Sequence, residues 1–210
     1  MRSVRSIAAS IAGTAVVAAG KFVAAAQTAL RLQQRGRPLT PDERALLWSV
    51  YRDSIGYDGI RIVEGRAGLF GVNKRPFTLG NTIYLKHLDP TAHPSTLVHE
   101  CCHVWQNQHE GSRYAVEALW AQATVRPNAY HWADEFGRGR ASWREFNKEA
   151  QAQFLQDVYR SGKGASAAGT AGSFYDGDVI ARDARFEHHG TDYTDFARDT
   201  IAYVRGLPPP

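Results

Sequence analysis

The sequence predicts an α+β fold: an Ala-rich N-terminal helix, a small antiparallel sheet, a helix with the pattern H-E-x-x-H, and further helices. Three observations predict it. Apolar residues alternate with period two between residues 60 and 85. They recur every three to four residues after residue 94 and again after residue 142. Gly, Pro and Asn separate these stretches, as expected of turns between short elements.

Length and composition limit the class of protein. A chain of 210 residues with 43% hydrophobic residues can bury the core of one domain, with or without an arm. Its two cysteines, Cys101 and Cys102, are adjacent and cannot form a disulfide framework. The net charge of +4 is uneven, because residues 1–41 carry +6 and the remainder −2. The folded part is therefore not a basic module, and we expect no nucleic-acid partner.

We divide the chain into four segments from its composition. They are a basic, Ala-rich arm at 1–36, a domain at 37–160, a Gly- and Ala-rich linker at 161–173, and a tail at 174–210 with a short helix near its end.

The arm at 1–36 allows two interpretations, which the sequence leaves open. Arg2 and Arg5, followed by a weakly apolar stretch and a run of small residues, outline a secretory signal. Lys21 interrupts the apolar run before it reaches the roughly 20 residues that span a bilayer, so we expect no transmembrane helix. The second interpretation is an uncleaved helix that contacts a membrane surface or a partner protein.

Local signals place the elements of the domain. Thr40 as N-cap, Pro41 at the first position and Glu43 as the partner in a capping box start a helix that ends near Gly56. Short strands are expected at 60–63, 69–70, 77–78 and 82–85. Helices are expected at 94–110, 114–123, 142–159 and 192–205.

The chemistry of the chain lies in the segment 99–103, which reads His-Glu-Cys-Cys-His. Two histidines four residues apart lie on one face of a helix, so both imidazoles can reach one metal ion. Glu100 then serves as the base beside the open coordination position. Apolar neighbours make the helix a buried one, which disfavours an ordinary pair of surface histidines. The sequence therefore predicts a Zn²⁺ site, although the same ligands accept other divalent metals.

A zinc site of this kind needs a third protein ligand. The acidic candidates are Glu117, Asp134, Glu135, Glu145, Glu149 and Asp157. Glu149 is the best placed, because it shares the apolar side of its predicted helix with Phe146 and Ala150. Asp157, two turns further along, is a candidate to accept the second N–H of a ligating histidine.

Catalysis would also need a donor to the negative charge that develops on the substrate oxygen. Tyr130 and His131 are the first candidates, because they lie in an aromatic loop at 126–140 between the ligand-bearing helices. Tyr114 and Tyr159 are alternatives.

Several segments match the pattern of one family over about residues 38–160. They are 38–43, 53–57, 61–62, 75–84, 97–106 and 147–152. In these segments the chain resembles the zinc-metallopeptidase domains of bacterial Rhs and Vgr-related secretion proteins. It is more distantly similar to the core domain associated with extracellular contractile injection systems. The adjacent cysteines are a departure, because such helices often carry small or aliphatic residues there.

The resemblance implies a zincin-like fold, His99, His103 and Glu149 as zinc ligands, and Glu100 as the catalytic base. We therefore expect a zinc-dependent peptidase with a protein or peptide substrate, linked to bacterial secretion or effector systems. The alternative is a non-catalytic, zinc-stabilised module that binds components of a secretion apparatus. The compartment stays open between secreted, periplasmic, and cytoplasmic before delivery.

Overall fold

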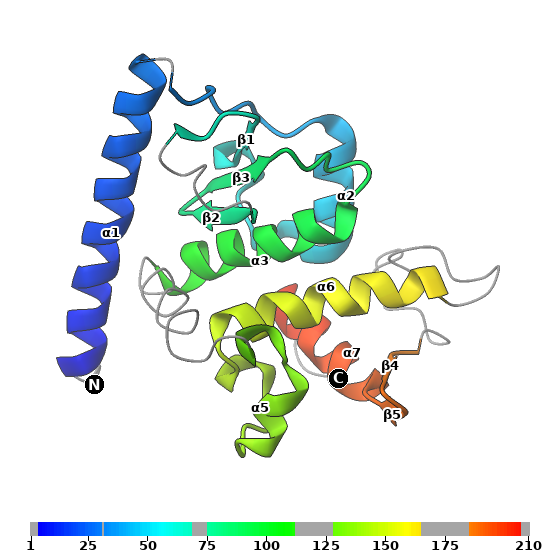
Figure 1. The fold of residues 1–210 in the computed structure, drawn as a ribbon. Helices are drawn as coiled ribbons and strands as arrows, with labels where there is room; N and C mark the ends of the chain where they lie inside the picture. The colour runs from blue at the N-terminus through cyan, green and yellow to red at the C-terminus, as the bar shows by residue number, and fades with distance from the viewer. Residues whose placement is uncertain (1–3, 31, 69–74, 112–127, 165–184, 207–210) are drawn as a thin grey trace.

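A computed structural model describes residues 4–30, 32–68, 75–111, 128–164 and 185–206 (Figure 1). Its α-helices are α1 (Val4–Ala29), α2 (Pro41–Tyr51), α3 (Pro94–Glu110), α5 (Ala133–Gly137), α6 (Lys148–Gly164) and α7 (Thr194–Val204). Its strands are β1 (Arg61–Glu64), β2 (Phe77–Leu79), β3 (Thr82–Lys86), β4 (Glu187–His188) and β5 (Thr191–Asp192). The α+β class is therefore confirmed. The expected strand at 69–70 and the expected helix at 114–123 lie outside the described residues.

Helix α2 begins where its capping signal predicts. Thr40 Oγ1 accepts a hydrogen bond from the backbone N–H of Glu43 at 3.2 Å, and Glu43 Oε2 accepts one from the backbone N–H of Thr40 at 2.8 Å. The helix ends at Tyr51, earlier than expected, because Arg52 adopts a φ of +50° that an α-helix cannot contain. Tyr51 Oη donates to the carbonyl of Val98 at 2.7 Å, which fastens α2 to α3.

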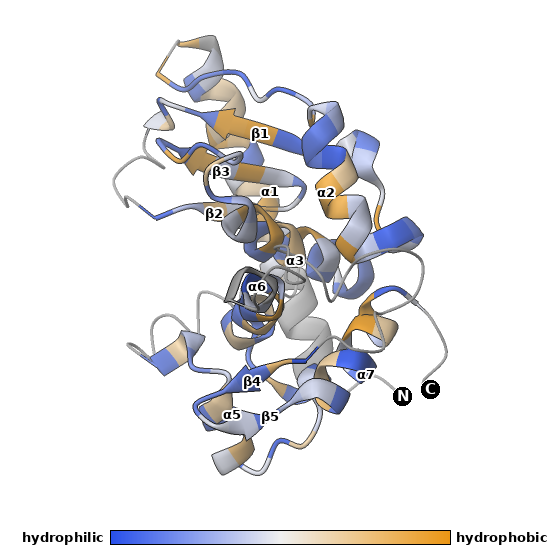
Figure 2. Ribbon diagram, turned by 90° about the vertical axis from the view of Figure 1, so that its right-hand side faces the viewer, coloured by the Kyte–Doolittle hydropathy of each residue, from blue (hydrophilic) through white to orange (hydrophobic). Residues whose placement is uncertain are grey.

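The three-stranded sheet has the order β1-β3-β2 and is mixed. Strands β2 and β3 form the expected antiparallel hairpin, whose turn contains Gly80 with a φ of +62°. Strand β1 instead pairs in parallel with β3, so the expectation of an antiparallel sheet is wrong for this pair. Alternating apolar residues identify a strand but not its neighbour, and β2, the next strand in the chain, lies on the far side of β3 from β1. The apolar segments of β1 and β3, in orange, lie beside each other (Figure 2).

Helices α3 and α6 lie across the middle of the molecule and form much of the main core (Figure 1). Cys101 and Cys102 on α3 are buried free thiols within this core, and burial raises the pKa of both. Helix α6 begins at Lys148 rather than at residue 142, because Phe146 has extended backbone with a ψ of 154°. It continues to Gly164, past the expected start of the linker at 161.

The two ends of the chain pack differently. Helix α7 joins the main core through Ala197, Ile201 and Val204. Helix α1 lies beside the sheet and buries Val17 against Leu79 of β2 in a separate small cluster. Among the helices that the structure describes, none is both long and apolar enough to cross a membrane.

Candidate metal centre

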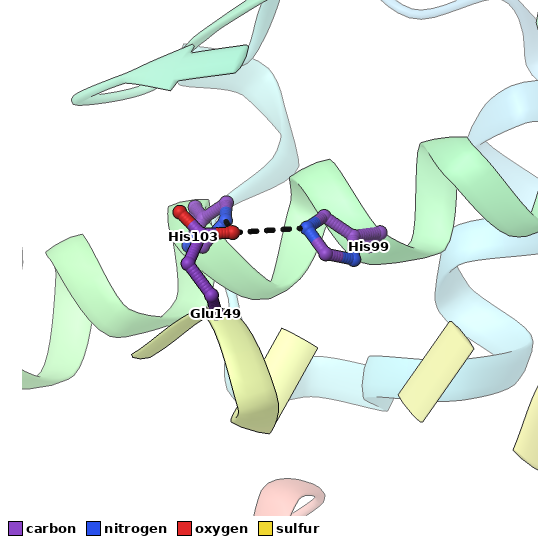
Figure 3. Close-up of side chains that lie close together, drawn as sticks. All are labelled: His99, His103 and Glu149. Carbon is purple, nitrogen blue, oxygen red and sulfur yellow. Dashed lines mark ion pairs between the residues drawn. The ribbon is translucent and has the colours of Figure 1, made fainter. Parts of the chain in front are cut away.

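Helix α3 carries His99 and His103 one turn apart on the same face (Figure 3). Both side chains are buried, at 8% and 6% exposure. Their ring centroids are 5.2 Å apart and the ring planes are inclined at 78°, so the two imidazoles converge without stacking. The i, i+4 spacing of the sequence motif therefore produces a convergent pair of nitrogen donors.

Glu149 reaches this pair from the first turn of α6 (Figure 3). Its Oε2 lies 3.5 Å from Nε2 of His99 and 3.5 Å from Nε2 of His103. All three donor atoms lie within 4.8 Å of one another. Ligands held about 2.0–2.1 Å from a tetrahedral zinc ion are about 3.3 Å apart, so the two 3.5 Å separations and the donor set are compatible with zinc.

The N-cap of α6 explains the position of Glu149. Asn147 Oδ1 accepts hydrogen bonds from the backbone N–H groups of Glu149 at 3.1 Å and of Ala150 at 3.0 Å, and thus caps α6. A carboxylate in the first turn also lies at the positive end of the helix dipole. Burial raises the pKa of Glu149, but His103 and His99 lower it further, so the pKa lies well below its ordinary value and the carboxyl is ionised.

Gln106, which the sequence analysis did not single out, orients the ring of His103. The amide nitrogen of Gln106 donates to the carbonyl of Lys148 at 3.1 Å and to Oε1 of Gln151 at 2.8 Å. Its Oε1 therefore faces His103 Nδ1 at 2.8 Å and accepts the proton of that nitrogen. This leaves Nε2 of His103 directed at Glu149, as a metal ligand requires. The sequence spacing could have indicated this contact, because residues three apart, such as His103 and Gln106, lie on the same face of a helix.

Electrostatics couple His103 to Glu149. Burial alone would lower the pKa of His103, but the charge and hydrogen bond of the Glu149 carboxylate raise it to about 9. Without a cation, the carboxylate therefore favours the protonated ring of His103. Two nitrogens and one carboxylate oxygen around the same point suit a divalent cation in place of that proton.

His99 contributes an unsatisfied buried atom. Its Nδ1 has no hydrogen-bond partner among the residues that the structure describes, while its Nε2 faces Glu149. Nε2 is thus the nitrogen of His99 that can serve as a ligand, and among the described residues Nδ1 lacks the kind of orienting partner that Gln106 gives to His103.

Glu100 follows His99 in the chain, lies next to the cluster and is buried. Thr78 on strand β2 donates from its hydroxyl to Glu100 Oε2 at 2.9 Å. Burial raises the pKa of Glu100, and the neighbouring Glu149 carboxylate adds to the increase, while His99 and His103 oppose it. A carboxyl with a raised pKa suits proton transfer. Thr78 was missed because only the tertiary fold brings β2 against α3.

Tyr130 and His131 are adjacent in the chain, but the structure separates them. The ring centroid of Tyr130 lies 6.0 Å from that of His99, and the guanidinium carbon of Arg75 lies 5.6 Å from the Tyr130 ring centroid. Burial, followed by the charge of Glu149, raises the pKa of Tyr130 to about 12, so its phenol keeps its proton at neutral pH. His131 is exposed instead, with Nδ1 3.8 Å from Asp134.

Asp157 does not contact either histidine in the described structure, which corrects the expected role. Its carboxylate accepts from Nε1 of Trp132 at 3.0 Å and from Nε2 of Gln153 at 2.8 Å. Eight residues along a helix correspond to about 12 Å, so Asp157 is too far along α6 from Glu149 to share its partners.

The remaining candidates have other positions. Glu135 is buried between Arg138, Arg140 and Asn147, and Glu145 completes the capping box of the 3₁₀ turn Trp143–Glu145. Tyr159 lies in the main core. Glu117 and Tyr114 lie outside the described residues.

No family model matches the chain, and no curated protein matches it. Among solved structures the chain is similar to the effector domain of VgrG2b from Pseudomonas aeruginosa. The identity is 21% and the TM-score 0.43, over 78% of this chain and 94% of that chain.

Proposed function

We propose that this chain is a zinc-dependent peptidase of zincin-like type. His99, His103 and Glu149 would hold the metal, and the observation that carries the proposal is the 3.5 Å separation of Glu149 Oε2 from both histidine Nε2 atoms. The group that could hold a metal has three members in the part of the chain that the structure describes. Three ligands are typical of a catalytic zinc site, which keeps one position for water or substrate.

Bound zinc would supply a Lewis acid that polarises the scissile carbonyl and acidifies water. Glu100 accepts the proton of the attacking water and passes it to the leaving amine, since its raised pKa brings it toward the working range of a general base. Thr78 holds the Glu100 carboxylate in place through its hydroxyl. Tyr130, protonated and beside His99, donates a hydrogen bond to the developing oxyanion.

The resemblance of residues 38–160 to domains of Rhs and Vgr-related proteins supports a place for this activity in bacterial secretion or effector systems. The partners would be components of such a system and a protein or peptide substrate. The basic arm at 1–36 is the segment we assign to any contact with a membrane surface.

The test is hydrolysis of a peptide library by the zinc-loaded chain, followed by mass spectrometry of the products. We expect Glu100→Gln to keep its zinc and to lose activity by about 10²- to 10⁴-fold, as for removal of a general base. Glu187→Gln, which changes an exposed carboxyl on β4, is the matched control and should be fully active. Equal hydrolysis by Glu100→Gln, or none by a parent chain with one zinc, would contradict the proposal; the latter would favour a zinc-stabilised binding module.

A further inference from the structure

We propose that Glu135 and Asn147 form a positioning unit that presents Glu149 to His99 and His103. The inference rests on the proposed function, because it concerns the third ligand of the same centre. In the part of the chain that the structure describes, the side-chain hydrogen bonds of these two residues lead to each other, to two arginines and to the first turn of α6, so their effect passes through the backbone there.

Glu135 on α5 is a completely buried carboxylate. It accepts hydrogen bonds from both nitrogen atoms of Asn147, the backbone N–H at 3.0 Å and Nδ2 at 3.1 Å. Arg138 and Arg140 also donate to its two oxygens. A buried charge is tolerated only when it is paired and hydrogen-bonded, and here every partner comes from the segment that leads into α6 or from the two arginines after α5.

The side chain of Asn147 joins this carboxylate to the helix. Its Nδ2 donates to Glu135, while its Oδ1 accepts from the backbone N–H groups of Glu149 and Ala150. One planar amide therefore bonds α5 on one edge and the first turn of α6 on the other. Because the nitrogen edge is bound to Glu135, the oxygen edge must face α6, and the amide cannot flip without losing both sets of bonds.

The unit of Glu135 and Asn147 matters for the metal centre because of where Glu149 lies. The residue lies in the first turn of α6, where backbone N–H groups have no partner within the helix and the end frays unless it is capped. Its Oε2 must lie between two nitrogen atoms at once. A first turn that moves by a fraction of an ångström carries the carboxylate out of that position, so the cap sets the ligand geometry.

A generic stabilising role makes a different prediction, and the chain offers a matched control. Ser142 caps the neighbouring 3₁₀ turn Trp143–Glu145 by accepting from the N–H of Arg144, and that turn carries no ligand. Removal of either cap lowers the stability of the backbone around it. Of the two, only removal of the Asn147 cap should also change the geometry of the metal centre.

The experiment measures zinc affinity of the full chain by competition with a chromophoric chelator, for the parent and for Asn147→Ala, Asn147→Ser and Ser142→Ala. We expect Asn147→Ala to bind zinc at least about tenfold more weakly, as for loss of a group that supports a ligand. Asn147→Ser keeps a hydroxyl acceptor for the cap but not the hydrogen bond to Glu135, so it should recover only part of the loss. Ser142→Ala should bind like the parent, although both alanine variants lower the unfolding temperature of the zinc-free chain.

Two further readouts separate positioning from folding. The visible absorption spectrum of the Co²⁺-loaded chain reports ligand geometry and should change in Asn147→Ala but not in Ser142→Ala. Glu135→Gln, which removes the charge that orients Asn147, should weaken zinc binding in the same direction. Parental zinc affinity and an unchanged Co²⁺ spectrum in Asn147→Ala would overturn the positioning role alone. Failure of the parent chain to bind zinc would overturn the proposed function, and this inference with it.

Discussion

The interface of α3 with α6 and the contact of α1 with the sheet represent two extremes of packing in this molecule. On α3 every residue from Leu97 to Gln106 is buried, and its polar side chains join hydrogen-bond networks or the metal centre. Among residues 12–28 of α1, whose burial the structure describes, Val17 is the buried hydrophobic residue, while Phe22 is 77% exposed. Gly20 allows the approach, because a Cβ atom there would collide with the side chain of Leu79.

The comparison shows where the geometry of the site comes from. The positions of the ligands on α3 and α6 are set by helix caps and by contacts between buried side chains of the main core. We call the domain at 37–160 the body, and the arm at 1–36 lies against it. The arm at 1–36 contacts the domain through the approach of α1 to β2 and through the backbone pairing of Gln33 with Ala67. Arg37, the first residue of the domain, forms ion pairs with Glu43 and Glu64. We therefore expect the metal centre to be insensitive to changes in α1 and sensitive to changes in the body.

The largest expected effect is that of zinc itself. Free zinc at about 1,000 times its dissociation constant should raise the free energy of unfolding by about 4 kcal/mol, because only the folded chain assembles the three ligands. Hydrogen exchange should slow in α3 and α6 and stay unchanged in α1, whose amides would exchange by local opening. An equal slowing in α1 would contradict the comparison, since α1 would then open only together with the body.

A matched pair of core substitutions should show a smaller effect. Val158 on α6 is fully buried in the main core, whereas Val17 on α1 packs on one side chain of the sheet. Val158→Ala should lower the free energy of unfolding by about 2 kcal/mol, because two methyl groups are lost and a cavity remains. Val17→Ala should cost less than about 1 kcal/mol. Denaturant unfolding measures both, and similar losses would show that α1 is integral to the core.

The smallest effect concerns the junction between arm and body. Burial raises the pKa of Glu43, but hydrogen bonds from Arg37 and Thr40 lower it further, so the net pKa lies below its ordinary value. Glu43→Gln keeps the capping box and removes the charge, and it should cost about 1 kcal/mol at pH 7.

The pH dependence of that difference has a definite sign. A carboxyl with a lowered pKa in the folded state contributes stability above its unfolded pKa of about 4.3, and loses it as the pH falls through the folded pKa. The gap between parent and Glu43→Gln should thus be constant from pH 7 to 5 and shrink below about pH 4. Urea titrations at several pH values measure it, and a gap that widens on acidification would refute the assignment.

Local signals predicted those parts of the site that depend on one helix. The spacing of His99 and His103 and the face of Glu149 follow from helical periodicity. Helical periodicity does not predict the start of α6. Ser142 and Glu145 form a capping box, but it begins a short 3₁₀ turn, and α6 itself starts after Asn147. Two valid caps five residues apart cannot be ranked from the sequence alone.

Features set by contacts between elements could not be predicted. The support of Glu100 by Thr78 and the pairing of Glu135 with Asn147 each join segments separated by a turn or more of chain. The parallel pairing of β1 with β3 likewise depends on the order of the strands in the sheet, where β3 lies between β1 and β2. Asp157 was misplaced because helical phase gives the face of a residue but not its distance along the axis from the ligand.

The central claim is that His99, His103 and Glu149 bind one metal ion with Glu100 as a separate base. Metal content measured by mass spectrometry on the purified chain, on Glu149→Ala and on Glu100→Ala tests it most directly. The account predicts one zinc ion per parent chain, much less in Glu149→Ala, and the parental amount in Glu100→Ala. A parent chain without bound metal, or a zinc content unaffected by Glu149→Ala, would contradict it.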